Sequence, residues 1–187
     1  QLVVAANPMY EELTKDLDVP YKKVGAILPA ITDEQYELLK PIKTKAFKNR
    51  VYDVEYMTRE KLLEMEPNLN PEVKGGLYIP RENIIDPFIY VQALAENANE
   101  NGVSFLLNTK VTGINTKDGK IKSVTTSGGI IETTYVINCA GLYCDEIAAM
   151  VGKANYKVVA RKGQFYILDK NTSCKVNKIV LPIPTKI

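Results

Sequence analysis

Apolar side chains recur along this chain in two rhythms, and each rhythm predicts one type of element. Spacings of three and four residues predict helices at residues 2–16 with a break at Asn7-Pro8, 32–40, 58–65, 87–101 and 142–152. The helix over 87–101 has the clearest signals, because Asp86 suits its cap, Pro87 its first turn and Asn101-Gly102 its end. Residues 40–50 are basic and include Pro41, which favours an exposed connection.

Alternating or continuous apolar runs predict strands between these helices. They cover residues 21–31, 52–56, 74–80, 103–107, 110–115, 121–126, 130–138, 156–161, 163–168 and 178–181. Asp118-Gly119 and Gly128-Gly129 are hairpin signals, so the strands between 110 and 138 are expected to form an antiparallel meander. The order of elements is not a plain βαβ repeat, and it predicts a mixed α/β fold.

The segment 136–152, VINCAGLYCDEIAAMVG, is expected to lead from a strand end straight into a helix. Cys139, Ala140 and Gly141 stand at the junction, where small residues let a ligand lie against the backbone. The amino terminus of a helix also supplies free N–H groups suited to phosphate. An ordinary turn between a strand and a helix has the same pattern, so the rest of the chain must decide.

Composition excludes several classes of function. The 187 residues are 45% hydrophobic and carry 24 basic and 22 acidic side chains, a net charge of +2 that argues against a nucleic-acid surface built on bulk charge. Cys139, Cys144 and Cys174 form neither a metal-binding spacing nor an even disulfide framework, which favours a reducing cytoplasm. No apolar run reaches the roughly 18 residues of a membrane span.

Two further features shape the expectations for activity. The chain contains no histidine, so a histidine base or ligand cannot come from it. It begins without methionine and ends at PIPTKI, which suggests a piece of a longer protein. None of its 11 glycines forms the GxGxxG phosphate-binding spacing.

Three stretches carry a resemblance to a known family. Residues 86–114, 136–152 and 160–169 (ARKGQFYILD) resemble the central portion of the D-amino-acid oxidase-like superfamily of FAD-dependent oxidoreductases. Within it, the bacterial FAD-dependent glycerol-3-phosphate dehydrogenase group is the most similar, and residues 9–30 and 59–80 agree. The resemblance implies a flavoprotein fold with a mixed-sheet substrate domain, to which 1–83 and 154–187 contribute, whereas 84–153 belong to the FAD-binding domain.

The resemblance also implies the roles of particular residues. The backbone of Val111 would meet the adenine, and Cys139, Ala140 and Gly141 would lie along the FAD. The substrate-side candidates are Arg161, Gly163, Gln164 and Tyr166. Three of these residues also have a plainer interpretation, since Cys139 and Tyr166 could be core residues and Arg161 a surface residue. Asn83 stands where relatives commonly have glycine, which suggests a left-handed turn, and Tyr78 could line a pocket or the core.

The implied function is oxidation of the carbinol of a small anionic hydroxy substrate by FAD, with glycerol 3-phosphate as the best candidate. An L-2-hydroxyglutarate or amino-acid oxidase and a non-catalytic scaffold are the alternatives. The resemblance assigns no catalytic residue and no metal. It leaves the electron acceptor open among a quinone, oxygen and a partner subunit. The location is expected to be cytoplasmic or on the inner face of the membrane, and the 187 residues alone are expected neither to hold FAD firmly nor to turn over.

Overall fold

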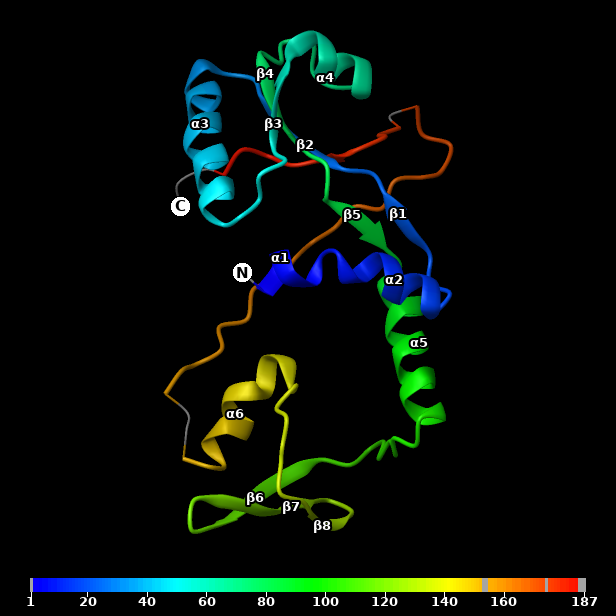
Figure 1. The fold of residues 1–187 in the computed structure, drawn as a ribbon, viewed down its shortest axis with the longest axis vertical. Coiled ribbons are helices and arrows are strands. Elements are labelled where there is room, and N and C mark those ends of the chain that lie inside the picture. The colour runs from blue at the N-terminus through cyan, green and yellow to red at the C-terminus, as the bar shows by residue number, and fades with distance from the viewer. Residues whose placement is uncertain (1, 153–154, 174, 185–187) are drawn as a thin grey trace. The chain divides into compact units, whose positions relative to one another are not determined.

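The computed structural model describes residues 2–152, 155–173 and 175–184 (Figure 1). The chain divides into two compact units, one formed by residues up to Val103 together with those from Leu168 onward, the other by Ser104–Ile167. The first unit contains α1 (Leu2–Ala6), α2 (Met9–Asp16), β1 (Tyr21–Lys23), β2 (Ala26–Ala30), α3 (Asp33–Lys48), β3 (Glu55–Thr58), α4 (Arg59–Met65), β4 (Gly75–Ile79), β5 (Asn83–Ile85), α5 (Pro87–Glu100) and β9 (Ile179–Val180). The second contains β6 (Val111–Lys117), β7 (Lys120–Thr126), β8 (Gly129–Glu132), the 3-10 turn η1 (Gly141–Tyr143) and α6 (Cys144–Ala149).

A four-stranded mixed sheet in the order β3-β4-β2-β9 forms the core of the first unit. β2 runs antiparallel to β4, with Leu28 opposite Leu77, and parallel to β9. Alternate side chains of β2 enter different clusters, because Leu28 packs with Leu39 of α3 and Ile27 with Leu62 of α4. The two helices therefore cover opposite faces of the sheet.

Helix α3 is longer than the sequence predicts. Its start is as expected, because Thr32 and Gln35 form a reciprocal capping box. The prediction of an exposed connection over 40–50 is wrong, since the helix continues through Pro41 to Lys48. Pro41 is exposed and cannot donate to the carbonyl of Glu37, but the apolar face from Leu39 to Ala46 continues to pack on the sheet. Burial of that face outweighs the lost hydrogen bond.

A two-stranded ribbon of β1 and β5 pairs Tyr21 with Ile85 and Lys23 with Asn83. The predicted strand over 21–31 is thus two strands, divided at Gly25, whose φ is +69°. The left-handed turn suggested for Asn83 is wrong, because this residue lies in β5 and its side-chain amide donates to the Tyr21 hydroxyl at 2.7 Å.

Two other predictions in the first unit are confirmed. The amino-terminal helix breaks between α1 and α2, at Asn7-Pro8. Asp86 caps α5 by accepting from the backbone N–H groups of Phe88 and Ile89 at 2.9 and 3.0 Å.

The second unit is built on the antiparallel meander β6-β7-β8. Asp118 and Gly119 form the predicted hairpin, with φ values of +53° and +71°. Ile114 of β6 and Val124 of β7 oppose each other and are the buried apolar residues of this sheet.

Several predicted strands are wrong. Within the part of the chain that the structure describes, residues 103–107, 133–138, 156–161 and 163–168 form no strand. A strand requires a ladder of hydrogen bonds to a neighbouring strand, and among the described residues these segments join no ladder, so most of their apolar side chains stay exposed. Ile137 is 87% exposed and Phe165 is 91% exposed. No helix in the described ranges combines the length and the apolar character needed to cross a bilayer.

Candidate functional site

The loop that joins the meander to α6 contains three of the predicted cofactor residues, and Asn138 sets its shape. The Asn138 side-chain oxygen accepts from the backbone N–H of Ala140 at 3.2 Å, and its amide donates to the carbonyl of Cys144 at 2.8 Å. Both bonds close the chain around Cys139 and fix where η1 begins. Sequence reasoning named Cys139, Ala140 and Gly141 but missed Asn138, although an Asn two residues before a turn is a known signal for this geometry.

The loop presents its backbone to open space. Cys139 is exposed, and Gly141 has a φ of +56° with no atom within 4 Å of where a Cβ would stand. A side chain at Gly141 would therefore project into space that a flat cofactor could use, and this fits an FAD lying against the backbone. The expected contribution of a helix dipole is small, because α6 has only six residues.

The chain that follows α6 returns to the amino-terminal end of that helix. Asp145 accepts from the backbone N–H of Val158 at 3.0 Å, and the Tyr156 hydroxyl donates to the carbonyl of Cys144 at 3.2 Å. The bond from Val158 lowers the pKa of the Asp145 carboxyl below its usual value, because the N–H group favours the charged form. These two bonds hold the segment that leads toward Arg161. Sequence reasoning did not identify Asp145 or Tyr156 as residues that hold it.

Val111 begins β6, which is an edge strand of the meander. Peptide groups on the free edge of such a strand are open to a ligand. The register shifts between Val111 and Gly113, and the Thr112 hydroxyl donates to the carbonyl of Thr125 at 3.3 Å. This irregular edge fits a contact between the Val111 backbone and an adenine ring.

The substrate-side candidates lie apart from any regular element. Arg161, Gly163, Gln164 and Tyr166 are all exposed, Tyr166 by 96%. Among the described residues the structure assigns no hydrogen bond or ion pair to Arg161, and no hydrogen bond joins any of these four residues to Cys139, Ala140 or Gly141. Their roles stay predictions. Tyr78, in contrast, packs against the core cluster around Leu62.

The thiol and carboxylate groups of the described residues form no metal-binding cluster. In the described ranges, no three or more Cys, Asp or Glu side chains are placed to hold a metal ion, and Cys139 and Cys144 are free thiols. Cys174 lies outside the described residues. What the loop around Cys139 to Gly141 offers a ligand is therefore a backbone surface of defined shape.

One family model matches almost the whole chain. The family model described as FAD dependent oxidoreductase (DAO) matches residues 1–186, and the chain belongs to this family. Its members take their redox chemistry from FAD, as the family description states.

The chain is also similar to individual oxidoreductases. The chain is 37% identical over its whole length to a glycerol 3-phosphate dehydrogenase of Caloramator mitchellensis and covers 39% of that protein. It is 26% identical, over 94% of its length, to an L-2-hydroxyglutarate dehydrogenase of Indibacter alkaliphilus, of which it covers 44%. Among solved structures, the L-alpha-glycerophosphate oxidase of Mycoplasma pneumoniae with FAD bound superimposes with a TM-score of 0.67 at 25% identity, covering 95% of this chain and 50% of that one. The chain thus spans half or less of the length of each.

Proposed function

We propose that this chain is the central part of a longer FAD-dependent dehydrogenase that oxidises glycerol 3-phosphate to dihydroxyacetone phosphate. The observation that carries the proposal is the 37% identity to a glycerol 3-phosphate dehydrogenase along the whole chain. Bound FAD would accept the hydride that leaves the carbinol carbon. The domain boundaries implied by the resemblance, near residues 83 and 153, are part of this proposal, and residue 153 lies outside the described residues.

The chain's own contribution would be to position the cofactor. The edge of β6 at Val111 would bind the adenine through its peptide groups. The backbone of Cys139, Ala140 and Gly141 would lie along the FAD, with Asn138 holding the loop in the required shape. Because the chain has no histidine, a histidine base would have to come from outside these residues.

The substrate would be recognised by the segment that follows Val158, the residue whose backbone N–H donates to Asp145. The guanidinium of Arg161 would pair with the phosphate, since arginine binds such oxyanions through two parallel N–H bonds. Gly163, Gln164 and Tyr166 would border the same space. The electron acceptor stays open among a quinone, oxygen and a partner subunit.

A second substrate is supported by the similarity to an L-2-hydroxyglutarate dehydrogenase. Both substrates carry a secondary hydroxyl and about two negative charges near neutral pH, so one chain architecture could serve either. Anaerobic bleaching of the flavin by each substrate separates them. The proposal expects bleaching by glycerol 3-phosphate at concentrations where L-2-hydroxyglutarate is inert, and the reverse order would refute it.

The contribution of Arg161 is tested in the protein that includes the flanking sequence. Arg161→Gln should raise KM for glycerol 3-phosphate by about tenfold or more, because a charge-assisted pair with the phosphate is lost. Lys162→Gln is the matched control, since it removes a neighbouring charge. Equal effects of the two changes would contradict a specific role for Arg161.

A further inference from the structure

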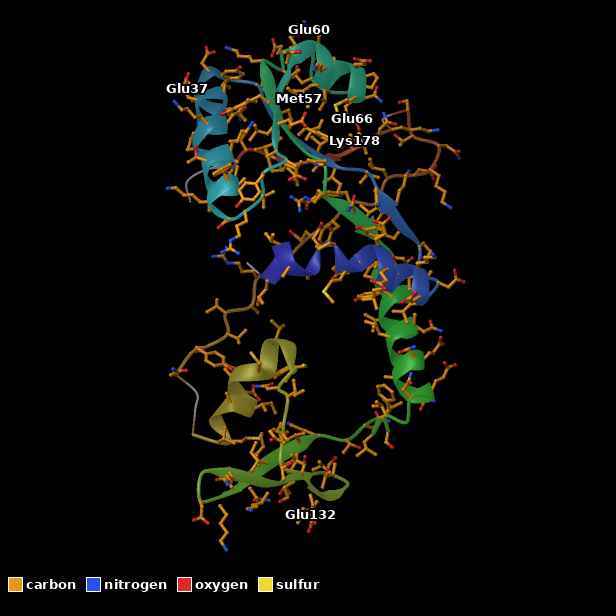
Figure 2. The ribbon with its side chains drawn as sticks, viewed as in Figure 1. Glu37, Met57, Glu60, Glu66, Glu132 and Lys178 are labelled. Carbon is orange, nitrogen blue, oxygen red and sulfur yellow. The ribbon has the colours of Figure 1, made fainter. Side chains whose placement is uncertain are left out.

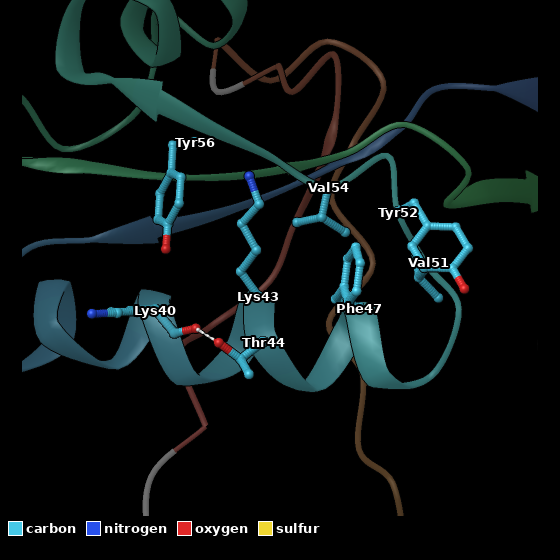
Figure 3. A pocket seen from close by; sticks show the side chains of 8 residues that line it. All are labelled: Lys40, Lys43, Thr44, Phe47, Val51, Tyr52, Val54 and Tyr56. Carbon is cyan, nitrogen blue, oxygen red and sulfur yellow. Dashed lines mark hydrogen bonds between the residues drawn. The ribbon is translucent and has the colours of Figure 1, made fainter.

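A hollow between α3 and the chain that leads into β3 lies in the first unit and contains none of the residues proposed for FAD or substrate. It has a volume of about 340 Å³ (Figure 3). Eight residues line it: Lys40, Lys43, Thr44, Phe47, Val51, Tyr52, Val54 and Tyr56. Five of the eight are apolar or aromatic, and two carry a positive charge. Its volume lies at the lower end of the range for small-molecule sites, about 300–1,000 Å³.

The apolar walls of the hollow come from α3 and from the chain that leads into β3. Phe47 of α3 and Tyr52 meet edge to face, with ring centroids 4.9 Å apart and planes at 71°. Val54 is buried, whereas Phe47 and Tyr52 remain 64% and 60% exposed. Large apolar side chains left exposed around a hollow favour an apolar occupant.

Lys43 places a positive charge within these walls. Its ammonium lies 4.5 Å from the centroid of the Tyr56 ring, and Figure 3 shows the side chain reaching from α3 between Tyr56 and Val54. No carboxylate lines the hollow, and among the described residues no ion pair involves Lys40 or Lys43.

The acidic groups nearby in sequence are directed elsewhere or bound. Glu55 alternates with Val54 and Tyr56 and so points to the other face of the sheet. Asp53 forms a bidentate pair with Arg81, at 2.5 and 2.9 Å. Lys40 and Lys43 therefore both lack an ion-pair partner among the described residues, and Figure 3 shows the Lys43 ammonium, not that of Lys40, between Tyr56 and Val54.

We propose that this hollow binds a small amphiphilic carboxylate. The carboxylate pairs with the ammonium of Lys43, and a short apolar chain lies along Phe47 and Val54. One ammonium, that of Lys43, lies within the apolar walls and matches a monoanion, and those walls require an apolar body. This site is separate in sequence and in function from the proposed oxidation of glycerol 3-phosphate.

The test uses the protein that includes the flanking sequence, labelled with ¹⁵N and titrated with sodium octanoate below the concentration at which octanoate aggregates. Saturable shifts are expected at residues 40–56. Octanol, which has the same chain and no charge, should bind at least about tenfold more weakly, because it lacks the charge-assisted pair. Equal binding of octanol, or octanoate shifts centred outside residues 40–56, would overturn the proposal.

Two variants locate the charge. Lys43→Gln should weaken octanoate binding by about tenfold. Lys45→Gln lies two residues further along the same helix, does not line the hollow, and should change binding by less than roughly twofold. Equal losses in both variants would show that octanoate responds only to the general charge of α3. Should Lys43→Gln prove unfolded by circular dichroism, the comparison of octanoate with octanol on the unaltered chain decides.

Discussion

Glu66 is expected to be the anchor of the last strand of the first unit. This residue follows α4, is fully buried, and accepts through Oε1 from the backbone N–H groups of Asn177, at 2.5 Å, and Lys178 (Figure 2). The Asn177 side chain adds a bond to the carbonyl of Met65 at 3.3 Å. These bonds join segments more than a hundred residues apart, immediately before β9 pairs with β2.

The expected cost of Glu66→Ala follows from these bonds. Two hydrogen bonds to a carboxylate are worth roughly 1.5–3 kcal/mol each. The change also removes Oε2, a buried oxygen without a partner among the described residues, whose burial costs about 1–3 kcal/mol. The middle of these ranges, about 4.5 kcal/mol lost and about 2 kcal/mol regained, leaves a net loss of about 2–3 kcal/mol, which corresponds to an opening equilibrium about 30- to 150-fold more favourable.

Hydrogen exchange measures that opening at β9 itself. The N–H of Ile179 donates to the carbonyl of Gly25 at 3.1 Å, and that of Leu181 to Ile27 at 2.9 Å. In Glu66→Ala, both amides should exchange about 30- to 150-fold faster. Glu66→Gln retains the accepting oxygen and should have a much smaller effect.

The matched control is Glu64→Ala, which removes an exposed carboxylate two residues earlier, in α4. It should leave exchange at Ile179 and Leu181 within roughly threefold, as surface substitutions usually do. Unchanged exchange in Glu66→Ala, or equal acceleration in Glu64→Ala, would refute the anchoring role.

Two further predictions concern the same unit. The bonds from Arg81 lower the pKa of Asp53, so Asp53 stabilises the fold above its ordinary pKa and loses that contribution as the pH falls through the lower, folded-state value. Urea unfolding should show Asp53→Asn less stable by up to about 1 kcal/mol near pH 6 and equal to the parent near pH 2, and a gap that is constant with pH would contradict this. Gly76→Ala places a Cβ 2.5 Å from the carbonyl oxygen of Leu28 and should lower the free energy of unfolding by about 1–3 kcal/mol, whereas Gly128→Ala, whose nearest neighbour is 3.8 Å away, should be nearly neutral by the same measurement.

The elements that could be predicted from the sequence are those whose signals are local. Asp86-Pro87 marks the start of α5, and Asp118-Gly119 closes the β6-β7 hairpin, because each depends on a few adjacent residues. Pro41 is a local signal that misled, since packing of Leu39 and its neighbours carries α3 past it. Tertiary burial determines where that helix ends.

The remaining errors arise from partners that a local pattern does not specify. Residues 133–138 have the apolar character of a strand, yet no described segment pairs with them. In the candidate site, small residues identified the loop at Cys139 to Gly141. Asn138 shapes that loop through local bonds that an Asn two residues before a turn can indicate, whereas the bond between Asp145 and Val158 joins residues whose proximity only the fold establishes.

The proposed contact between FAD and the backbone at Gly141 is tested most directly by FAD binding. The binding is measured in the protein with its flanking sequence and compared between Gly141→Ala and Gly119→Ala. Both glycines have positive φ, +56° and +71°, and both have open space where a Cβ would stand, so the two changes impose similar backbone strain. If the backbone at Gly141 lies against the cofactor, Gly141→Ala should raise the dissociation constant of FAD by about tenfold, while Gly119→Ala changes it by less than roughly twofold. An equal FAD affinity in both variants, or no binding by the unaltered protein, would contradict the account.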